Sequence, residues 1–242
     1  MKRYRTLKTL DRSLISCTAC PRLVEWREEV AITKRKSYQD EEYWGRPVPG
    51  FGSDNPKIVI VGLAPGAHGA NRTGRIFTGD SSGDWLYRSL HKNGLASIPT
   101  SKDKDDGQEL FDTRITCAVH CAPPGNKPSI EERDQCSHWF TNELGLVYPS
   151  MRALVALGSF AWDAVVRTLR SEFEITEFID SKGRVERNPR FGHEARFEWR
   201  DEQGNRRVLL GSYHPSQQNT FTGKLTEAML DRVFEQASRF AR

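Results

Sequence analysis

Three loop-like segments of the sequence contain side chains that could recognise and act on a small polar ring or an anion. Residues 62–80 contain five glycines, so a ligand can approach backbone amides that no Cβ shields. Residues 121–128 place Asn126 among three prolines, and its side-chain amide offers both an acceptor and donors. Residues 214–224 begin with His214 and continue with an amide-rich stretch. Together these segments predict a binding or catalytic site.

Each segment also has a simpler interpretation. The spacing of Gly69 and Gly74 matches a phosphate-binding loop, but Arg75 and Ile76 replace the required lysine and hydroxyl residue. A lone asparagine in such a loop is most often a turn residue, and a lone histidine is most often structural. The amide-rich stretch after His214 favours a function, because amides suit contacts to phosphates and groove edges of DNA.

Alternating strand-like and helix-like patterns predict the scaffold that positions these segments. Four short apolar runs predict buried strands, at residues 57–62, 113–119, 153–158 and 208–213. Helical patterns separate or follow them, at about residues 81–95, 129–147, 159–170 and 223–240. We expect a three-layer α/β/α fold with a central, mostly parallel four-stranded sheet. The three segments follow strands, so they should meet at the carboxyl edge, where α/β sheets bind ligands.

Length and composition indicate one large domain, residues 1–242. Hydrophobic residues make up 37% of the chain and charged residues 28%, which allows a core under a polar surface. No apolar run approaches the roughly 20 residues of a membrane span, and no apolar signal segment follows the basic N-terminus. We therefore expect a cytoplasmic protein without membrane contact. The net charge of +4 is too small to indicate nucleic-acid binding by itself.

Five cysteines raise the question of a metal site. An odd number in a cytoplasmic chain argues against a disulfide framework. Cys17 and Cys20 form a C-x-x-C pair, which Cys121 and Cys136 could complete. Cys117 would then be a buried strand thiol, although it could exchange roles with Cys121 if its strand ends early. The spacing does not decide between zinc and an iron–sulfur cluster.

At three places the sequence is similar to one enzyme family nearly residue for residue. The strings Gly-Leu-Ala-Pro-Gly…Phe-Thr-Gly-Asp, Cys-Ala-Pro-Pro-Gly-Asn and His-Pro-Ser-Gln-Gln-Asn-Thr-Phe-Thr-Gly resemble those of the uracil-DNA glycosylase superfamily. The closest resemblance is to its iron–sulfur-containing family 5, also called type-5. It covers roughly residues 14–235. A less typical stretch with a hairpin pattern, at about 171–207, is interpreted as a variable insertion.

The resemblance implies a hydrolase of base-excision repair that flips uracil out of DNA and hydrolyses its N-glycosidic bond. It implies catalytic roles for His214, which would stabilise the departing base, and for Asp80, which would orient water or stabilise the sugar cation. Asn126 would read the base edge. The remaining expected substrate contacts are Gly62, Leu63, Ala64, Phe77, Gln218 and Asn219. Expected contacts to phosphates and grooves are Arg72, Arg75, Lys224 and Phe221.

The resemblance also implies a cofactor, a substrate range and a rival function. Family 4 and 5 enzymes hold a [4Fe-4S] cluster, here on Cys17, Cys20, Cys121 and Cys136. Family 5 members act on hypoxanthine and other modified bases besides uracil. We expect a monomer that works on DNA at the nucleoid. The main alternative is a non-catalytic iron–sulfur protein that binds nucleic acid on the same fold; a family 4 enzyme would share the fold and the cluster.

Overall fold

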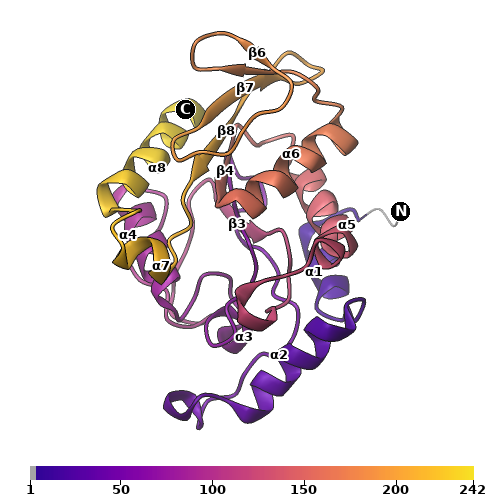
Figure 1. Ribbon diagram of the computed structural model, residues 1–242, viewed down its shortest axis with the longest axis vertical. Helices are drawn as coiled ribbons and strands as arrows, with labels where there is room; N and C mark the ends of the chain where they lie inside the picture. The colour runs from indigo at the N-terminus through magenta and orange to yellow at the C-terminus, as the bar shows by residue number, and fades with distance from the viewer. Residues whose placement is uncertain (1–3) are drawn as a thin grey trace.

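The computed structural model describes residues 4–242, which form an eight-stranded sheet with helices on both faces (Figure 1). The strand order is β1-β3-β2-β4-β8-β7-β5-β6. The four central strands are parallel and match the four predicted runs: β3 (Thr113–Cys117), β2 (Ile58–Gly62), β4 (Ala153–Leu157) and β8 (Arg206–Ser212).

The sheet is wider than the four strands predicted, which correspond to its parallel centre. Four short antiparallel strands extend both edges: β1 (Phe51–Gly52), β5 (Phe178–Asp180), β6 (Val185–Glu186) and β7 (Arg196–Arg200). Three of the four are too short to leave a periodic pattern in the sequence. The fourth, β7, forms the predicted hairpin with β8 around the turn at Asp201, whose Oδ1 accepts from the Asn205 amide at 2.8 Å.

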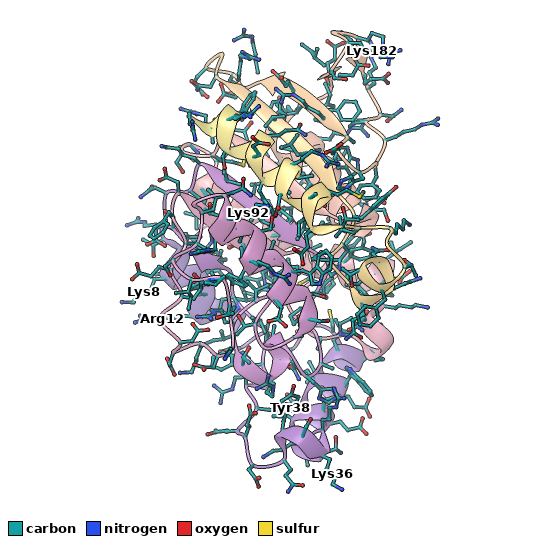
Figure 2. All side chains as sticks on the ribbon, turned by 90° about the vertical axis from the view of Figure 1, so that its left-hand side faces the viewer. Lys8, Arg12, Lys36, Tyr38, Lys92 and Lys182 are labelled. Atoms are coloured by element: carbon teal, nitrogen blue, oxygen red, sulfur yellow. The ribbon has the colours of Figure 1, made fainter. Side chains whose placement is uncertain are left out.

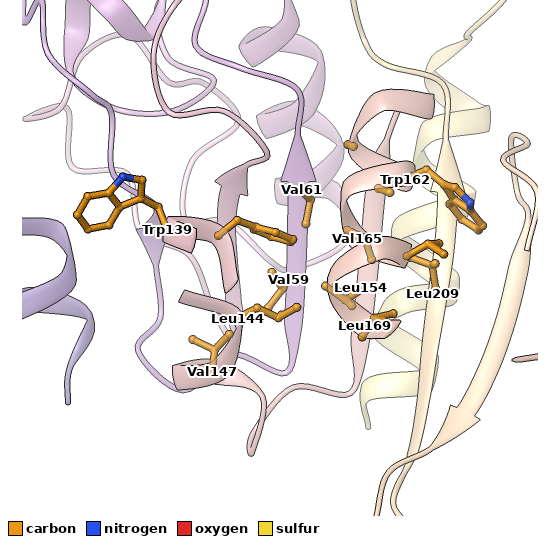
Figure 3. Packing of buried hydrophobic residues seen from close by; sticks show 14 of the residues in the cluster. Val59, Val61, Trp139, Leu144, Val147, Leu154, Trp162, Val165, Leu169 and Leu209 are labelled. Atoms are coloured by element: carbon orange, nitrogen blue, oxygen red, sulfur yellow. The ribbon is translucent and has the colours of Figure 1, made fainter. Parts of the chain in front are cut away.

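Side chains of the central strands are buried on both faces, as expected for a parallel sheet between helical layers. In β2, Val59 and Val61 pack into one core, whereas Ile58 and Ile60 pack into the other. Figure 3 shows the first of these cores, in which Val59 and Val61 face the helical residues Leu144 and Val165. This two-sided burial fixes the strands and therefore the loops at their ends.

Two helical layers cover the sheet. On one face lie α1 (Leu7–Leu14), α5 (Ile130–Val147) and α6 (Ser159–Phe173), and on the other lie α4 (Ser81–Lys92) and α8 (Glu227–Ala241). The four predicted helices are α4, α5, α6 and α8, while α1 was not predicted. Shorter or peripheral elements are α2 (Pro21–Thr33), α3 (Ala70–Thr73), α7 (Gln217–Phe221) and 3-10 turns at Lys36–Tyr38 and Pro124–Asn126.

The helix α5 begins after an N-cap at Ser129. Its hydroxyl accepts from the Glu132 amide at 3.2 Å, and the Glu132 carboxylate accepts from the Ser129 amide at 2.7 Å. This reciprocal capping box satisfies two amides that a helix start would otherwise leave unpaired. The cap also fixes where the loop containing Asn126 ends.

The molecule is elongated, and its ends carry different elements. Lys36 and Tyr38 lie at one end of the long axis and Lys182, in the β5–β6 turn, lies at the other (Figure 2). The helices α3 and α7, which follow β2 and β8, lie on the Lys36 side of the sheet (Figure 1). Among residues 4–242, no helix combines the length and the apolar character needed to cross a membrane.

Candidate active site

The loops that follow β2 and β8 meet at the carboxyl edge of the sheet. The rings of Phe77 and His214, far apart in the sequence, lie 5.6 Å apart between centroids with an interplanar angle of 31°. Two of the residues predicted to form a site are therefore in contact. The contact joins the glycine-rich loop to the loop that begins after the last central strand.

His214 is held by its backbone, while its ring remains available. Its carbonyl accepts a hydrogen bond from the Asn219 side-chain amide at 2.9 Å, so Asn219 positions the histidine. A Cβ placed on Gly158 would lie 3.5 Å from the His214 Cβ, which shows how closely the end of β4 approaches. Burial lowers the pKa of His214 to about 4, so the imidazole is neutral near pH 7. Within residues 4–242 no side chain or carbonyl hydrogen-bonds to its ring.

Phe77 owes its position to two glycines and a left-handed backbone. Its φ of 51° is uncommon for a bulky residue, and its side chain is 6% exposed. A Cβ on Gly62 would lie 2.7 Å from the Phe77 ring, and a Cβ on Gly83 would lie 2.0 Å from its carbonyl oxygen. The strand-ending Gly62 is therefore required for the ring to reach His214.

Asp80 lies inside the glycine-rich loop. Its carboxylate caps α4 by accepting from the Gly83 amide at 2.9 Å. Its other oxygen occupies the space that side chains at Gly66 and Gly69 would fill, because Cβ atoms there would lie 2.9 Å and 2.1 Å from it. Burial raises the pKa of Asp80 above the ordinary carboxyl value. The structure thus brings a desolvated carboxyl group beside Gly66 and Gly69, which have no side chains of their own.

The segment that contains Asn126, residues 121–128, makes no hydrogen bond or ring contact with Phe77 or His214 among the described residues. Asn126 is exposed, and both Gly125 and Asn126 adopt left-handed backbone conformations, with φ values of 60° and 56°. Its backbone N–H bonds to the Pro123 carbonyl at 3.2 Å, and no interaction within residues 4–242 fixes its side chain. The predicted grouping of Asn126 with His214 therefore stays a prediction.

The remaining predicted substrate contacts have mixed environments. Leu63 and Ala64 are half-buried at the end of β2, and the carbonyls of Gly62 and Leu63 accept from the backbone that continues β3. Gln218 is exposed on α7. Gly62 and Leu63 thus hold the loop, and Gln218 is free to contact a ligand.

Two of the expected phosphate contacts are wrong. Arg72 is 8% exposed, pairs with Glu41 and stacks on the Tyr38 ring at 4.0 Å. Arg75 is 5% exposed and pairs with Asp106 at 2.6 Å. Both guanidinium groups form internal ion pairs that stabilise the glycine-rich loop. Neither can bind DNA without breaking its ion pair.

Sequence reasoning missed Tyr213, which lies beside the histidine at the end of β8. Its ring stacks on His193 with centroids 5.1 Å apart, and the Lys224 ammonium lies 4.7 Å from the ring centroid. The only available signal was an aromatic residue next to a histidine at the end of an apolar strand. Lys224, a predicted phosphate contact, is exposed and is held near the site by this cation–π contact.

Four of the five cysteines line one cavity between α1, α2, α5 and the end of β3: Cys17, Cys20, Cys121 and Cys136. Cys117 belongs to the core on the opposite face of the sheet, where a Cβ on Gly62 would lie 3.0 Å from its sulfur. Burial raises the pKa of the Cys121 thiol to about 11. The structure therefore divides the cysteines into four and one, as the C-x-x-C interpretation expected.

The same cavity is bordered by polar hydrogens without acceptors. Arg27 donates to the Cys121 sulfur at 3.0 Å through one nitrogen, but its Nε has no partner. The indole nitrogen of Trp139, which also borders the cavity, has none either. Across residues 4–242, no three His, Cys, Asp or Glu side chains are arranged to hold a metal ion as they stand. The cavity offers thiols and N–H donors, a set that suits a group with acceptor atoms of its own.

Comparison with known proteins gives a consistent result. The family model of the uracil DNA glycosylase superfamily matches residues 49–238. The chain is 50% identical over 236 residues to the type-5 uracil-DNA glycosylase of Mycobacterium leprae, covering 98% of this chain and 96% of that protein. It is 46% identical over 230 residues to the type-5 uracil-DNA glycosylase of Thermus thermophilus, covering 95% and 96%.

Proposed function

Since the chain belongs to the uracil DNA glycosylase superfamily, we propose that it is a type-5 uracil-DNA glycosylase, a hydrolase of DNA repair. The observation that carries this proposal is the contact of Phe77 with His214, formed by two strand-end loops of the family fold. The similarity to a type-5 enzyme extends over nearly the whole chain, so it includes both of these loops and the strands that they follow.

The first step is the extrusion of the base, because its glycosidic bond is not accessible inside the duplex. The flipped base would lie against the Phe77 ring, whose position is fixed by its packing on Gly62. Stacking on an aromatic side chain is tolerant of base identity. Recognition of uracil must then come from hydrogen bonds to its edge, for which Asn126 and the backbone at Leu63 and Ala64 are the available groups.

Bond cleavage places negative charge on the departing base and positive charge on the sugar. His214 is neutral near pH 7 and can donate one ring N–H to the base oxygen as its charge develops. A neutral donor does not have to lose a proton to be ready for the next cycle. The burial that lowers the pKa of His214 also strengthens this hydrogen bond, because little water competes for it.

Asp80 would act on the sugar side of the bond. Its carboxylate points into the Gly66–Gly69 turn, where a water molecule could be oriented or an oxocarbenium-like sugar stabilised. The helix start that it caps limits its movement, since the Gly83 amide holds one of its oxygens. We assign the orientation of the attacking water molecule to the Asp80 carboxylate.

We also propose that the four-cysteine cavity holds a [4Fe-4S] cluster. The donor set fits, because four thiols meet at one cavity while Cys117 lies across the sheet, and unpartnered N–H groups of Arg27 and Trp139 could bond to cluster sulfides. Such a cluster would tie α2 to the segment that precedes Asn126, a structural role. Cys17 and Cys20 would anchor it from the N-terminal side, Cys121 and Cys136 from the other.

Iron and sulfide analysis of anaerobically purified protein tests the cluster. Cys121→Ala should lose iron and the visible absorption of the cluster, whereas the matched variant Cys117→Ala should keep both. Full iron retention in Cys121→Ala would remove that cysteine from the ligand set. Zinc in place of iron in the wild-type protein would contradict the cluster itself.

The function is tested with oligonucleotides that each contain one lesion, followed by alkaline cleavage of the abasic product. We expect strand scission at uracil. We also expect it at hypoxanthine, because the resemblance to family 5 implies a substrate range wider than uracil. A protein that binds these oligonucleotides but never yields an abasic site would instead be a non-catalytic nucleic-acid-binding protein. The same panel run on single and double strands would establish strand preference.

A further inference from the structure

The catalytic edge lacks the cations that two predicted arginines were expected to supply. Arg72 and Arg75 are buried in internal ion pairs, which leaves Lys224 as the only one of the three predicted phosphate contacts that is exposed. A glycosylase that bends and opens a duplex must nevertheless hold the strand on both sides of the flipped nucleotide. Other basic side chains near His214 are therefore needed.

A groove beside the active site carries such side chains. It lies between α5, α6 and residues 188–191 and encloses about 750 Å³. Four arginines and one carboxylate account for its charged lining: Arg133, Arg167, Arg170, Arg190 and Asp163. Phe191 and the edge of the buried Trp162 complete it. The groove therefore combines a net positive charge with apolar surface.

Three contacts place the groove next to the catalytic histidine. The helix α6 begins directly after Gly158, whose Cβ position lies 3.5 Å from His214. Phe191, in the groove, lies 6.2 Å from the Tyr213 ring between centroids. A Cβ on Gly211 would lie 2.4 Å from the Gly192 carbonyl, so the groove loop packs directly on β8. The groove therefore lies beside the end of β8 and the start of α6, and both of these adjoin His214.

Two of the four arginines, Arg167 and Arg190, are exposed, whereas Arg133 and Arg170 are half-buried. Asp163, Arg167 and Arg170 share one face of α6, because residues three and four apart lie above one another. From Ser159 to Arg170 the helix rises about 16 Å, enough to pass more than one phosphate. The Arg167 side chain is 58% exposed although it pairs with Asp134, and Arg190 is exposed without an ion pair within residues 4–242.

We propose that this arginine groove binds the phosphodiester backbone of the DNA strand that flanks the flipped nucleotide. The proposal rests on the proposed function, since it takes the flipped base to lie at His214. Guanidinium groups suit this ligand because they donate paired hydrogen bonds to phosphate oxygens. Phe191 would contact the sugar edge of the same strand. The groove residues 188–191 belong to the stretch that the sequence marked as an insertion, so that insertion would contribute to substrate binding.

A second basic cavity provides a matched comparison. It is lined by Arg152, Arg196, Arg206 and Arg239 and also contains an aromatic residue, Phe240. It lies at the opposite edge of the sheet, because Arg152 precedes β4 and Arg206 begins β8. The Arg206 and Arg239 side chains are 61% and 72% exposed and pair with glutamates, much as Arg167 pairs with an aspartate. Removing them changes the net charge equally but far from the catalytic edge.

The test compares two double variants, Arg167→Ala/Arg190→Ala and Arg206→Ala/Arg239→Ala, by fluorescence anisotropy on a duplex without a lesion. The groove variant should raise the Kd about tenfold at 0.1 M salt and reduce the magnitude of the negative slope of log K against log salt by about 1 to 2. The control variant should leave both near the wild-type values. A third variant, Arg167→Lys/Arg190→Lys, should restore most of the slope because it keeps the charge.

Duplexes trimmed on one side of a central uracil locate the contact. On one of the two trimmed duplexes, the wild type and the groove variant should bind equally, since the strand that reaches the groove is missing. Equal losses in the groove and control variants would show a general charge effect and overturn the proposal. An unchanged salt slope in the groove variant would overturn it as well. Excision of uracil is measured separately. A wild-type protein without excision activity would contradict the proposed function, whereas the salt slopes of DNA binding would still test the groove.

Discussion

The two sides of the proposed site are built in different ways. On one side Phe77 and His214 are in contact, Asp80 fills the adjacent turn, and glycines at fixed positions make these approaches possible. On the other side Asn126 is exposed in a left-handed turn, with a free side chain. We infer that the side acting on the bond is preorganised, whereas the side reading the base becomes ordered only when a base is bound. Loss of a preorganised group should therefore affect rate more than binding.

The largest expected effect is that of His214→Ala. Removing a preorganised donor to a developing anion lowers the rate by on the order of 10² to 10³, so the single-turnover rate at uracil should fall by that factor. The Kd for uncleaved DNA should change little, because the hydrogen bond strengthens only as charge develops. The control is His91→Ala, at an exposed position near the end of α4. A near-normal rate in His214→Ala would remove the preorganised side from the mechanism.

A smaller effect on the same side is expected from pH. Burial raises the pKa of Asp80, so its carboxylate becomes protonated at a pH above the ordinary range of carboxyl groups. If the ionised form orients water, the single-turnover rate should fall as pH drops through that raised pKa. His214 should add no step to the pH–rate profile near pH 6.5. Its pKa is about 4, so the imidazole is neutral both just above and just below pH 6.5.

The variant Asp80→Asn separates this explanation from general acid unfolding. It should be slow at all pH values and lack the acidic limb, whereas Asp105→Asn, at an exposed position in the loop before β3, should keep the wild-type profile. Circular dichroism over the same pH range checks that both variants remain folded. An acidic limb that persists in Asp80→Asn must come from another group.

The strands and loops of the preorganised side could be predicted from local patterns, whereas the roles of Phe77 and Asp80 came only from the resemblance to a family. Apolar runs gave the four parallel strands, and each loop had to follow its strand to the carboxyl edge. What the patterns could not show is which charges are buried. Arg72 and Arg75 read as surface cations, yet partners 31 positions away, Glu41 and Asp106, hold both in ion pairs. Sequence gives the sign of a side chain but not its long-range partner.

The short edge strands and the first helix were missed for a related reason. Strands such as β1 and β6 are two residues long and exist only because a neighbouring strand pairs with them. The helix α1 contributes Leu7, Leu10 and Leu14 to the core beside α5, but a helix of only eight residues is not stable without tertiary packing. Both are stabilised by tertiary contacts rather than by local propensity.

The smallest expected effect lies on the open side. Asn126→Ala removes the proposed reader of the base edge, which is exposed, and leaves an alanine at a φ of 56°. The variant should fold with a free energy of unfolding lower by about 1 kcal/mol, because asparagine tolerates a left-handed backbone better than alanine does. Since uracil would lose the hydrogen bonds that Asn126 makes to its edge, kcat/KM for uracil should fall by about tenfold. Lys127→Ala, at the next exposed position of the same turn, is the control.

The kinetic step that Asn126→Ala slows distinguishes a side chain that becomes ordered on binding from one that is preorganised. If Asn126 becomes ordered only around a bound base, its removal should raise KM or slow base flipping, with a smaller change in the rate of cleavage once the base is flipped. Fluorescence of a reporter base opposite the lesion follows flipping separately from cleavage. A loss as large as that of His214→Ala, confined to the cleavage step, would show that Asn126 acts on the transition state and that the two sides are alike.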